Sequence, residues 1–153
     1  MLVRGDKMKI LFVCTGNTCR SPMAEAILQS KQNGVSEVRS AGIHTVDGLP
    51  ISRHAQSILQ DLEIPYSETS KLIDSKDVAW AEYILTMTAN HQDLLRQSFP
   101  AESHKIHTLK GLIDESEAGD VIDPYGGDLS VYKKTFTELE QLIEKLQVQL
   151  YGG

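Results

Sequence analysis

The stretch KILFVCTGNTCRS, residues 9–21, joins an apolar run directly to a short polar loop. Residues 10–13 are aliphatic or aromatic, which is typical of a strand buried on both faces of a parallel sheet. Cys14 stands where that strand is expected to end. Gly16 and Asn17 follow, and both residue types tolerate a positive φ. The stretch therefore predicts a buried strand followed by a tight loop.

The end of this loop has the features of a helix start. Serine is a good helix cap and proline is favoured at the first helical position, as at Ser21 and Pro22. A loop on a helix N-terminus points several backbone N–H groups into one concavity, which favours an anion. We therefore expect a phosphate-binding loop made of Thr15, Gly16, Asn17, Thr18, Cys19, Arg20 and Ser21.

Two side chains in the loop suit chemistry on a phosphoryl group. The backbone N–H groups that bind an anion would also stabilise the Cys14 thiolate, lowering its pKa from about 8.5 into the range of roughly 3.5 to 7.5. Arg20 follows six positions later, so its planar guanidinium can fold back and bind two phosphoryl oxygens. Cys14 is thus a candidate nucleophile and Arg20 a candidate phosphoryl ligand.

Length and composition narrow the class of protein. A chain of 153 residues is long enough for one domain with its own core. A net charge of −6 argues against nucleic acid or an anionic membrane as a general partner. The only cysteines, Cys14 and Cys19, are too close together to staple the fold, which favours a reducing, cytoplasmic location. Residues 1–7 lack the apolar core of a signal peptide, and we expect a disordered extension there before a domain at 8–153.

The remaining periodicity predicts alternating helices and strands. This order indicates a single α/β domain with a four-stranded parallel sheet and helices on both faces. The last helix carries the strongest apolar stripe and should pack beside the first. The expected elements are a helix at 21–32, a strand at 35–40, a helix at 55–62, a strand at 79–87, a helix ending near 99, a strand at 105–109, an irregular acidic segment at 111–120 and a helix at 129–151.

A second polar element, VIDPYGGD at residues 121–128, precedes the last helix. Asp123 before proline favours an extended or turn conformation, and Asp128 is a candidate N-cap. A structural turn alone would explain this pattern. A cysteine-dependent phosphatase, however, also requires a general acid for its leaving group, and Asp123 is the candidate for that role.

VCTGNTCRSP at residues 13–22, together with Asp123-Pro124-Tyr125, resembles the low-molecular-weight protein tyrosine phosphatase family. The resemblance covers nearly the whole chain from Met8. It implies the Rossmann-like fold of the phosphotyrosine protein phosphatase I type, without a metal or cofactor. By this resemblance Cys14 is the nucleophile, Arg20 binds the phosphoryl group and Asp123 is the acid.

The same resemblance implies a set of supporting residues. Ser21 steadies the thiolate and Asn17 holds the unusual backbone of the loop, while Ser40 supports the loop from the second strand. Many relatives also have a histidine, just before the position of Lys71, that supports the loop through Ser40. No histidine stands there in this chain, so we expect the support to differ.

Thr18 bears on the substrate. Most tyrosine-specific members of the family have Ile or Leu at this position, whereas CTGNTCRS and the Asp-Pro-aromatic-Gly-Gly turn resemble a protein arginine phosphatase branch. A threonine hydroxyl offers a polar contact to a phosphorylated guanidinium, and Tyr125 can stack on a guanidinium or on a phenyl ring. The favoured substrate is phosphoarginine in proteins and the alternative is phosphotyrosine, with Thr18 a tolerated isostere. Phosphate-like oxyanions should inhibit either activity.

Rival functions lack required residues. A three-cysteine arsenate reductase needs two further cysteines, and none follows Cys19. A cysteine phosphocarrier, which must keep its phosphocysteine from hydrolysing, would lack the Arg20 and Asp123 pair. The five histidines have no spacing that suits zinc ligation with Cys14 and Cys19, and we expect surface or packing roles for them. Cys19 itself is either a packing thiol or a redox partner of Cys14.

Overall fold

The computed structural model describes residues 7–31, 36–114 and 119–151. The extension expected at 1–7 lies outside these residues, except for the exposed Lys7. The strands are β1 (Met8–Cys14), β2 (Ser36–Gly42), β3 (Tyr83–Thr86) and β4 (Ile106–Thr108). The helices are α1 (Arg20–Lys31), α2 (Arg53–Asp61), α3 (Ser75–Trp80), α4 (Ala89–Ser98), the 3-10 helix η1 (Pro100–Lys105), α5 (Leu109–Ile113) and α6 (Leu129–Tyr151).

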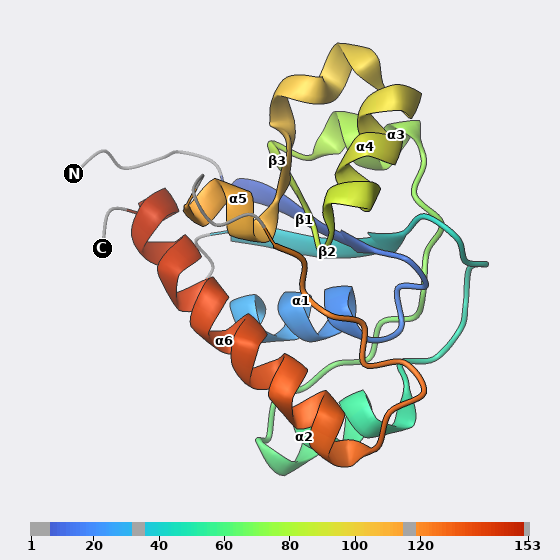
Figure 1. Cartoon of the computed structure of the whole chain (residues 1–153), viewed down its shortest axis with the longest axis vertical. Helices are drawn as coiled ribbons and strands as arrows, with labels where there is room; N and C mark the ends of the chain where they lie inside the picture. The colour runs from blue at the N-terminus through green and yellow to red at the C-terminus, as the bar shows by residue number, and fades with distance from the viewer. Residues whose placement is uncertain (1–6, 32–35, 115–118, 152–153) are drawn as a thin grey trace.

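The strands form one parallel sheet in the order β2-β1-β3-β4. Helices α1, α2 and α6 lie on one side of the sheet, and α3 and α4 lie on the other (Figure 1). This arrangement confirms the predicted α/β fold with helices on both faces. In open sheets of this kind ligands bind beyond the carboxyl ends of the strands, and the loop after β1 occupies such an end.

Side chains of β1 alternate between two apolar clusters. Ile10, Phe12 and Cys14 belong to the cluster that contains residues of α1, α2 and α6. Leu11 and Val13 belong to the other cluster, with Val78 of α3 and Leu95 of α4. Both faces of β1 are therefore buried, as its apolar run predicts, and Cys14 is on the face covered by α1 and α6.

The last helix matches its predicted bounds. Residues Tyr132, Phe136, Leu139, Ile143 and Leu146 form its buried stripe, and it packs beside α1 as expected. Asp128 caps it, since its carboxylate accepts hydrogen bonds from the Val131 N–H at 3.1 Å and the Ser130 hydroxyl at 2.7 Å. No helix within the described residues has the length and apolarity needed to cross a membrane.

Two predicted boundaries are wrong by more than two residues. The strand expected at 79–87 begins only at Tyr83, because Ala79 and Trp80 close α3. That helix is stabilised by a capping box between Asp74 and Asp77, whose reciprocal hydrogen bonds begin a helix without an apolar stripe.

The second wrong boundary concerns the acidic segment. The structure places Gly111–Ile113 in α5 instead of an irregular stretch. The Thr108 hydroxyl accepts a hydrogen bond from the Gly111 N–H and so caps this short helix. Residues 115–118 of the predicted segment lie outside the described residues. Similarly, the first residue of the strand predicted at 35–40 lies outside them, and β2 continues to Gly42.

Candidate active site

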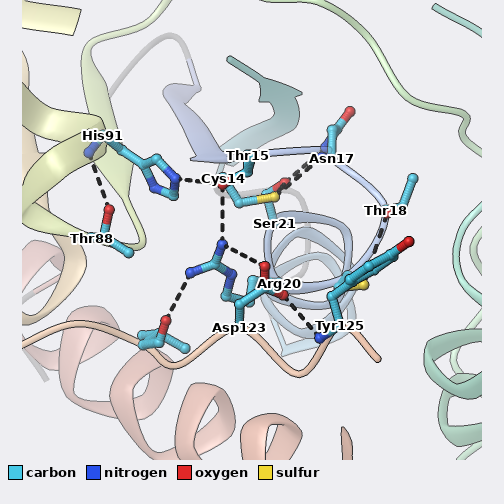
Figure 2. Close-up of polar contacts among 12 residues, drawn as sticks. Cys14, Thr15, Asn17, Thr18, Arg20, Ser21, Thr88, His91, Asp123 and Tyr125 are labelled. Carbon is cyan, nitrogen blue, oxygen red and sulfur yellow. Dashed lines mark hydrogen bonds and ion pairs between the residues drawn. The ribbon is translucent and has the colours of Figure 1, made fainter. Parts of the chain in front are cut away.

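Cys14 is the last residue of β1 and lies at the bottom of the loop (Figure 2). Its residue surface is only 2% exposed. The Sγ atom lies 2.8 Å from Ser21 Oγ and accepts a hydrogen bond from the Asn17 N–H at 3.3 Å. The thiol therefore contacts a backbone donor from the middle of the loop and a hydroxyl at its end.

The thiol pKa differs from the sequence-based prediction. Burial is the largest influence and raises the pKa of Cys14 above its usual value, while the contacts of Ser21, the charge of Arg20 and the Asn17 N–H lower it. The prediction of a lowered pKa considered only these last interactions and is wrong, because it left out the burial of the thiol, which removes most of its contact with water. The donors around Sγ oppose that cost of burial.

Arg20 is buried and opens α1. Its Nη1 donates to the Val121 carbonyl at 2.9 Å, and its Nη2 lies 3.4 Å from Thr15 Oγ1 and 3.5 Å from Asp123 Oδ2. Because the helix begins at Arg20, Ser21 lies inside its first turn and is not the cap that its residue type predicts. The Ser21 hydroxyl contacts the Cys14 sulfur instead of capping the helix.

Asp123 reaches the loop from far along the chain. The segment is held at the end of the sheet because the Val121 N–H donates to the Met87 carbonyl at 2.8 Å. The Asp123 carboxylate accepts the Tyr125 N–H at 3.0 Å, and its side chain is 46% exposed. Asp123 thus combines an ion pair to Arg20 with access to solvent.

A cavity of about 220 Å³ lies between the loop and the Asp123 segment. Two larger cavities, of about 450 and 310 Å³, lie elsewhere, and neither is lined by Cys14, Arg20 or Asp123. Tyr125, at 80% exposed, stands at the rim, and Thr18 forms part of the wall. The lining residues are Cys14, Thr15, Gly16, Thr18, Cys19, Arg20, Asp123 and Tyr125. All eight predicted site residues outside the support set of Asn17, Ser21 and Ser40 therefore line this one cavity.

Asn17 organises the loop from behind this cavity. It has φ 56°, so the positive backbone angle expected in this loop falls on Asn17 and not on Gly16. Its Nδ2 donates to Ser21 Oγ at 2.8 Å and to Ser40 Oγ at 2.9 Å, while its Oδ1 accepts the Lys71 N–H at 2.9 Å. The predicted support residues are thus joined to one another through one side-chain amide.

Glycine at position 42 lets β2 approach the loop. A Cβ there would lie 2.8 Å from the Thr15 carbonyl oxygen and 3.1 Å from Asn17 Cβ. The Thr15 carbonyl accepts the His44 N–H at 2.9 Å and the Cys14 carbonyl accepts the Ile43 N–H at 3.1 Å, directly after this glycine. The loop is therefore fixed against the end of β2 by backbone contacts.

Sequence reasoning missed Glu25 and Tyr66. The buried Glu25 carboxylate accepts hydrogen bonds from Ser40 Oγ at 2.6 Å and from the Tyr66 hydroxyl at 2.8 Å. The sequence does contain one indication of the role of Glu25, because Glu25 follows Ser21 by four positions and so lies on the same face of the helix. A carboxylate on that face, among Met23, Ala24, Ile27 and Leu28, required a buried partner.

His91 is a further residue that the sequence did not reveal. It is buried at the start of α4, and its Nε2 lies 2.8 Å from Thr15 Oγ1. The expectation of a surface or packing role is therefore incomplete, because His91 contacts the loop that also holds Arg20. The contact arises from the crossing of α4 over the sheet end, which no local pattern predicts.

The titration of His91 gives a testable pH dependence. Burial, followed by the charge of Arg20, lowers the pKa of His91 to about 4. In the unfolded chain this histidine has a pKa of about 6.5, so on acidification it is protonated there before it is protonated in the folded protein. The contribution of neutral His91 to the free energy of unfolding is therefore complete above about pH 6.5 and is lost as the pH falls toward 4. At pH 5 the loss should be about 1 kcal/mol, allowing for solvent screening. Urea unfolding at pH 7 and pH 5 measures it, and His91→Gln should lose less stability than the wild type over that interval.

The geometry of the site defines a class of protein. A thiol at the end of a parallel strand, a buried guanidinium and a solvent-accessible carboxylate around one anion-binding loop are the parts of a cysteine-dependent phosphatase. Within the described residues no three His, Cys, Asp or Glu side chains are grouped so as to hold a metal ion.

The family follows from the comparisons. Residues 9–151 match the model of the low molecular weight phosphotyrosine protein phosphatases, and the chain belongs to this family. A protein-arginine-phosphatase of Geobacillus stearothermophilus is 42% identical over 142 residues, covering 93% of this chain and 95% of that protein. A Staphylococcus aureus protein, the low molecular weight protein-tyrosine-phosphatase PtpB, is 39% identical over 140 residues, covering 92% of this chain and 97% of that protein.

Solved structures agree with this assignment. The structure of a YwlE arginine phosphatase variant, with serine in place of a cysteine and a phosphorylated active-site serine, superposes with a TM-score of 0.90 at 37% identity. The superposition covers 94% of this chain and 96% of that one. The resemblance stated from the sequence is therefore confirmed, and the chain is a phosphatase of this family.

Proposed function

We propose that this protein hydrolyses phosphoarginine in protein substrates through a phosphocysteine at Cys14. The observation that carries the substrate assignment is Thr18, a polar residue in the wall of the same cavity that Cys14 and Tyr125 line. A guanidinium carries several N–H donors in one plane, and a threonine oxygen accepts such a donor whereas an aliphatic side chain does not. Relatives named for arginine and for tyrosine are similar to this chain to nearly the same degree, so the cavity wall decides between the two substrates.

The first step transfers the phosphoryl group to the enzyme. The Cys14 thiolate attacks phosphorus as the bond from phosphorus to the guanidine nitrogen breaks. The protonated Asp123 gives its proton to that nitrogen, so arginine leaves with its full complement of protons. Arg20 and the loop N–H groups stabilise the charge on the three remaining phosphoryl oxygens.

The second step releases phosphate. Asp123, now ionised, takes a proton from a water that attacks the phosphocysteine, and the bond between sulfur and phosphorus breaks. Inorganic phosphate leaves, and both the Cys14 thiolate and the protonated Asp123 are restored. The exposure of Asp123 at the cavity rim supports this role, because water must reach it between the two steps.

Replacing Thr18 tests the substrate assignment. Thr18→Ile should reverse the preference, lowering kcat/KM for phosphoarginine and raising it for phosphotyrosine, by about tenfold in the ratio since one polar contact is exchanged for apolar area. Competition assays on one peptide carrying either modification measure that ratio.

Thr18→Val is the matched control for this exchange, because it removes the hydroxyl at nearly constant volume. It should lower phosphoarginine turnover without an equal gain on phosphotyrosine. If both variants keep the wild-type ratio, Thr18 is only a tolerated isostere and the assignment loses its support.

Cys19 is proposed to protect the nucleophile from irreversible oxidation. Its thiol is free and buried, lies 3.4 Å from the Tyr132 hydroxyl, and lines the same cavity as Cys14. Peroxide would oxidise Cys14 to a sulfenic acid, which condenses with the Cys19 thiol to a disulfide and releases water.

Mass spectrometry after mild peroxide treatment tests this protection. The expected product is a Cys14–Cys19 disulfide whose reduction restores activity. Cys19→Ser should instead accumulate sulfinic or sulfonic acid at Cys14 and lose activity permanently. Absence of the disulfide in the wild type, or equal recovery of both proteins, argues for a packing role alone.

The same site should accept free oxyanions. Inorganic phosphate and vanadate present the oxygens that Arg20 and the loop N–H groups would bind, so both are expected to compete with substrate. We also place the protein in the cytoplasm, where a phosphatase that depends on two free thiols stays reduced.

A further inference from the structure

An unbroken run of side-chain hydrogen bonds leads from Tyr66 to the Cys14 thiol. Tyr66 donates to Glu25 at 2.8 Å, Ser40 donates to the same carboxylate oxygen at 2.6 Å, and Asn17 donates to Ser40 at 2.9 Å. Asn17 also donates to Ser21 at 2.8 Å, whose Oγ lies 2.8 Å from Cys14 Sγ. Tyr66 belongs to the segment between α2 and α3 and lines no part of the phosphate cavity.

The amide of Asn17 fixes the direction of these hydrogen bonds. The Lys71 N–H donates to Asn17 Oδ1, which leaves Nδ2 with its two hydrogens facing Ser21 and Ser40. Ser21 Oγ therefore accepts from Asn17. Its single hydrogen is left for Cys14, where it stabilises a thiolate.

Ser40 keeps this direction only while its own hydrogen has an acceptor. That acceptor is the Glu25 carboxylate, which also receives the Tyr66 hydroxyl and, at 3.3 Å, the Gln29 side-chain amide. An ionised carboxylate accepts from all three donors, whereas a protonated one has a hydrogen of its own to place. If Glu25 took up a proton, Ser40 could turn its hydroxyl away and Asn17 would lose a fixed partner.

We propose that Tyr66 is a positioning residue whose hydroxyl, by holding Glu25 ionised, fixes the hydrogen-bond direction that ends in a Ser21 donor to the Cys14 sulfur. The role is needed because Cys14 and Glu25 are both buried, and burial disfavours the charged form of each. The inference rests on the proposed nucleophilic role of Cys14.

The electrostatics around Glu25 explain why its ionised form needs these donors. Burial, the largest influence, raises the pKa of Glu25 above its usual value and the nearby Glu68 carboxylate adds to this, while the hydrogen bonds from Ser40, Tyr66 and Gln29 oppose it. Arg39 and Lys71 are the cationic residues that line the adjoining cavity. Burial and the charge of Glu25 also raise the pKa of Tyr66, so its phenol stays a donor over the working pH range.

Alkylation of Cys14 by iodoacetamide across a pH series tests the proposal without requiring turnover. Tyr66→Phe should move the midpoint of the rate profile upward by about half a pH unit. Removing one hydrogen bond from a buried network weakens the others only in part, so the hydrogen bond from Ser21 to the Cys14 sulfur should be weakened and not lost. Glu25→Gln should move it in the same direction by at least as much. Peptide mapping identifies Cys14, and not Cys19, as the alkylated residue.

Two controls separate positioning from a general loss of structure. Tyr83→Phe removes a hydroxyl from a half-buried tyrosine of β3 and should leave the midpoint unchanged. In a Ser21→Ala background, Tyr66→Phe should produce no further shift, because the final donor is already absent. An unchanged midpoint in Tyr66→Phe, or an equal shift with and without Ser21, overturns the proposal. Turnover by Cys14→Ser, measured separately, would instead count against the nucleophilic role.

Discussion

Replacing Cys14 with serine removes phosphatase turnover, with an expected loss of at least about 10⁴-fold in kcat. The reason is that a serine hydroxyl at this position is not ionised near neutral pH and is a poor leaving group in the second step. Ser21, Asn17 and Arg20 still surround the replaced atom, so binding of substrate should change far less than kcat. Phosphate release from a phosphorylated protein, followed under saturating substrate, measures the effect.

The serine variant also offers a positive signature. A relative with serine in place of a cysteine carries a phosphorylated active-site serine, so slow transfer to the hydroxyl would leave a stable phosphoserine. We expect intact-mass analysis to find one phosphoryl group on Cys14→Ser after incubation with substrate, and none on Cys14→Ala. Normal turnover by either variant would rule out the phosphocysteine mechanism.

Asp123→Asn should lower kcat by roughly 10²- to 10⁴-fold, the usual contribution of general acid–base catalysis. The amide can neither protonate the departing nitrogen nor take a proton from water, so both chemical steps slow down. Arg20 also loses the carboxylate that lies 3.5 Å from its Nη2. Steady-state kinetics on phosphoarginine should show the loss mainly in kcat.

Asp128→Asn is the matched control for that experiment. The two aspartates are five residues apart and both exposed, but Asp128 caps α6, a role that asparagine fills equally well. Its activity should stay near that of the wild type. An Asp123→Asn enzyme that retains activity within a few-fold of the wild type would show that another group moves the proton.

Much of the fold could be predicted because its signals are local. The apolar run of β1 and the stripe of α6 each satisfy one periodicity along the sequence, and both elements have nearly their expected bounds. The strand predicted at 79–87 was wrong for a local reason too, since Ala79 and Trp80 are apolar but follow the Asp74 capping box. The capping box at Asp74 favours a helix through these two residues more strongly than their apolar character favours a strand.

The site divides in the same way. The sequence predicts Cys14, Arg20 and Asp123 as site residues because the chemistry requires particular residue types in a particular loop context, and the three residues line one cavity. His91, Glu25 and Tyr66 were missed because each acts through a contact between distant segments, with 76 positions separating Thr15 from His91 and 41 separating Glu25 from Tyr66. The Cys14 pKa was mispredicted for a related reason, because the extent of burial depends on the closed loop as a whole.

The most direct measurement is kcat/KM for the wild-type protein on one peptide sequence carrying either phosphoarginine or phosphotyrosine, at the same pH and ionic strength. Thr18 in the cavity wall, together with Asp123 of the same cavity as the proposed general acid, predicts faster hydrolysis of phosphoarginine. Equal or faster hydrolysis of phosphotyrosine would contradict the proposed substrate while leaving the phosphocysteine chemistry in place.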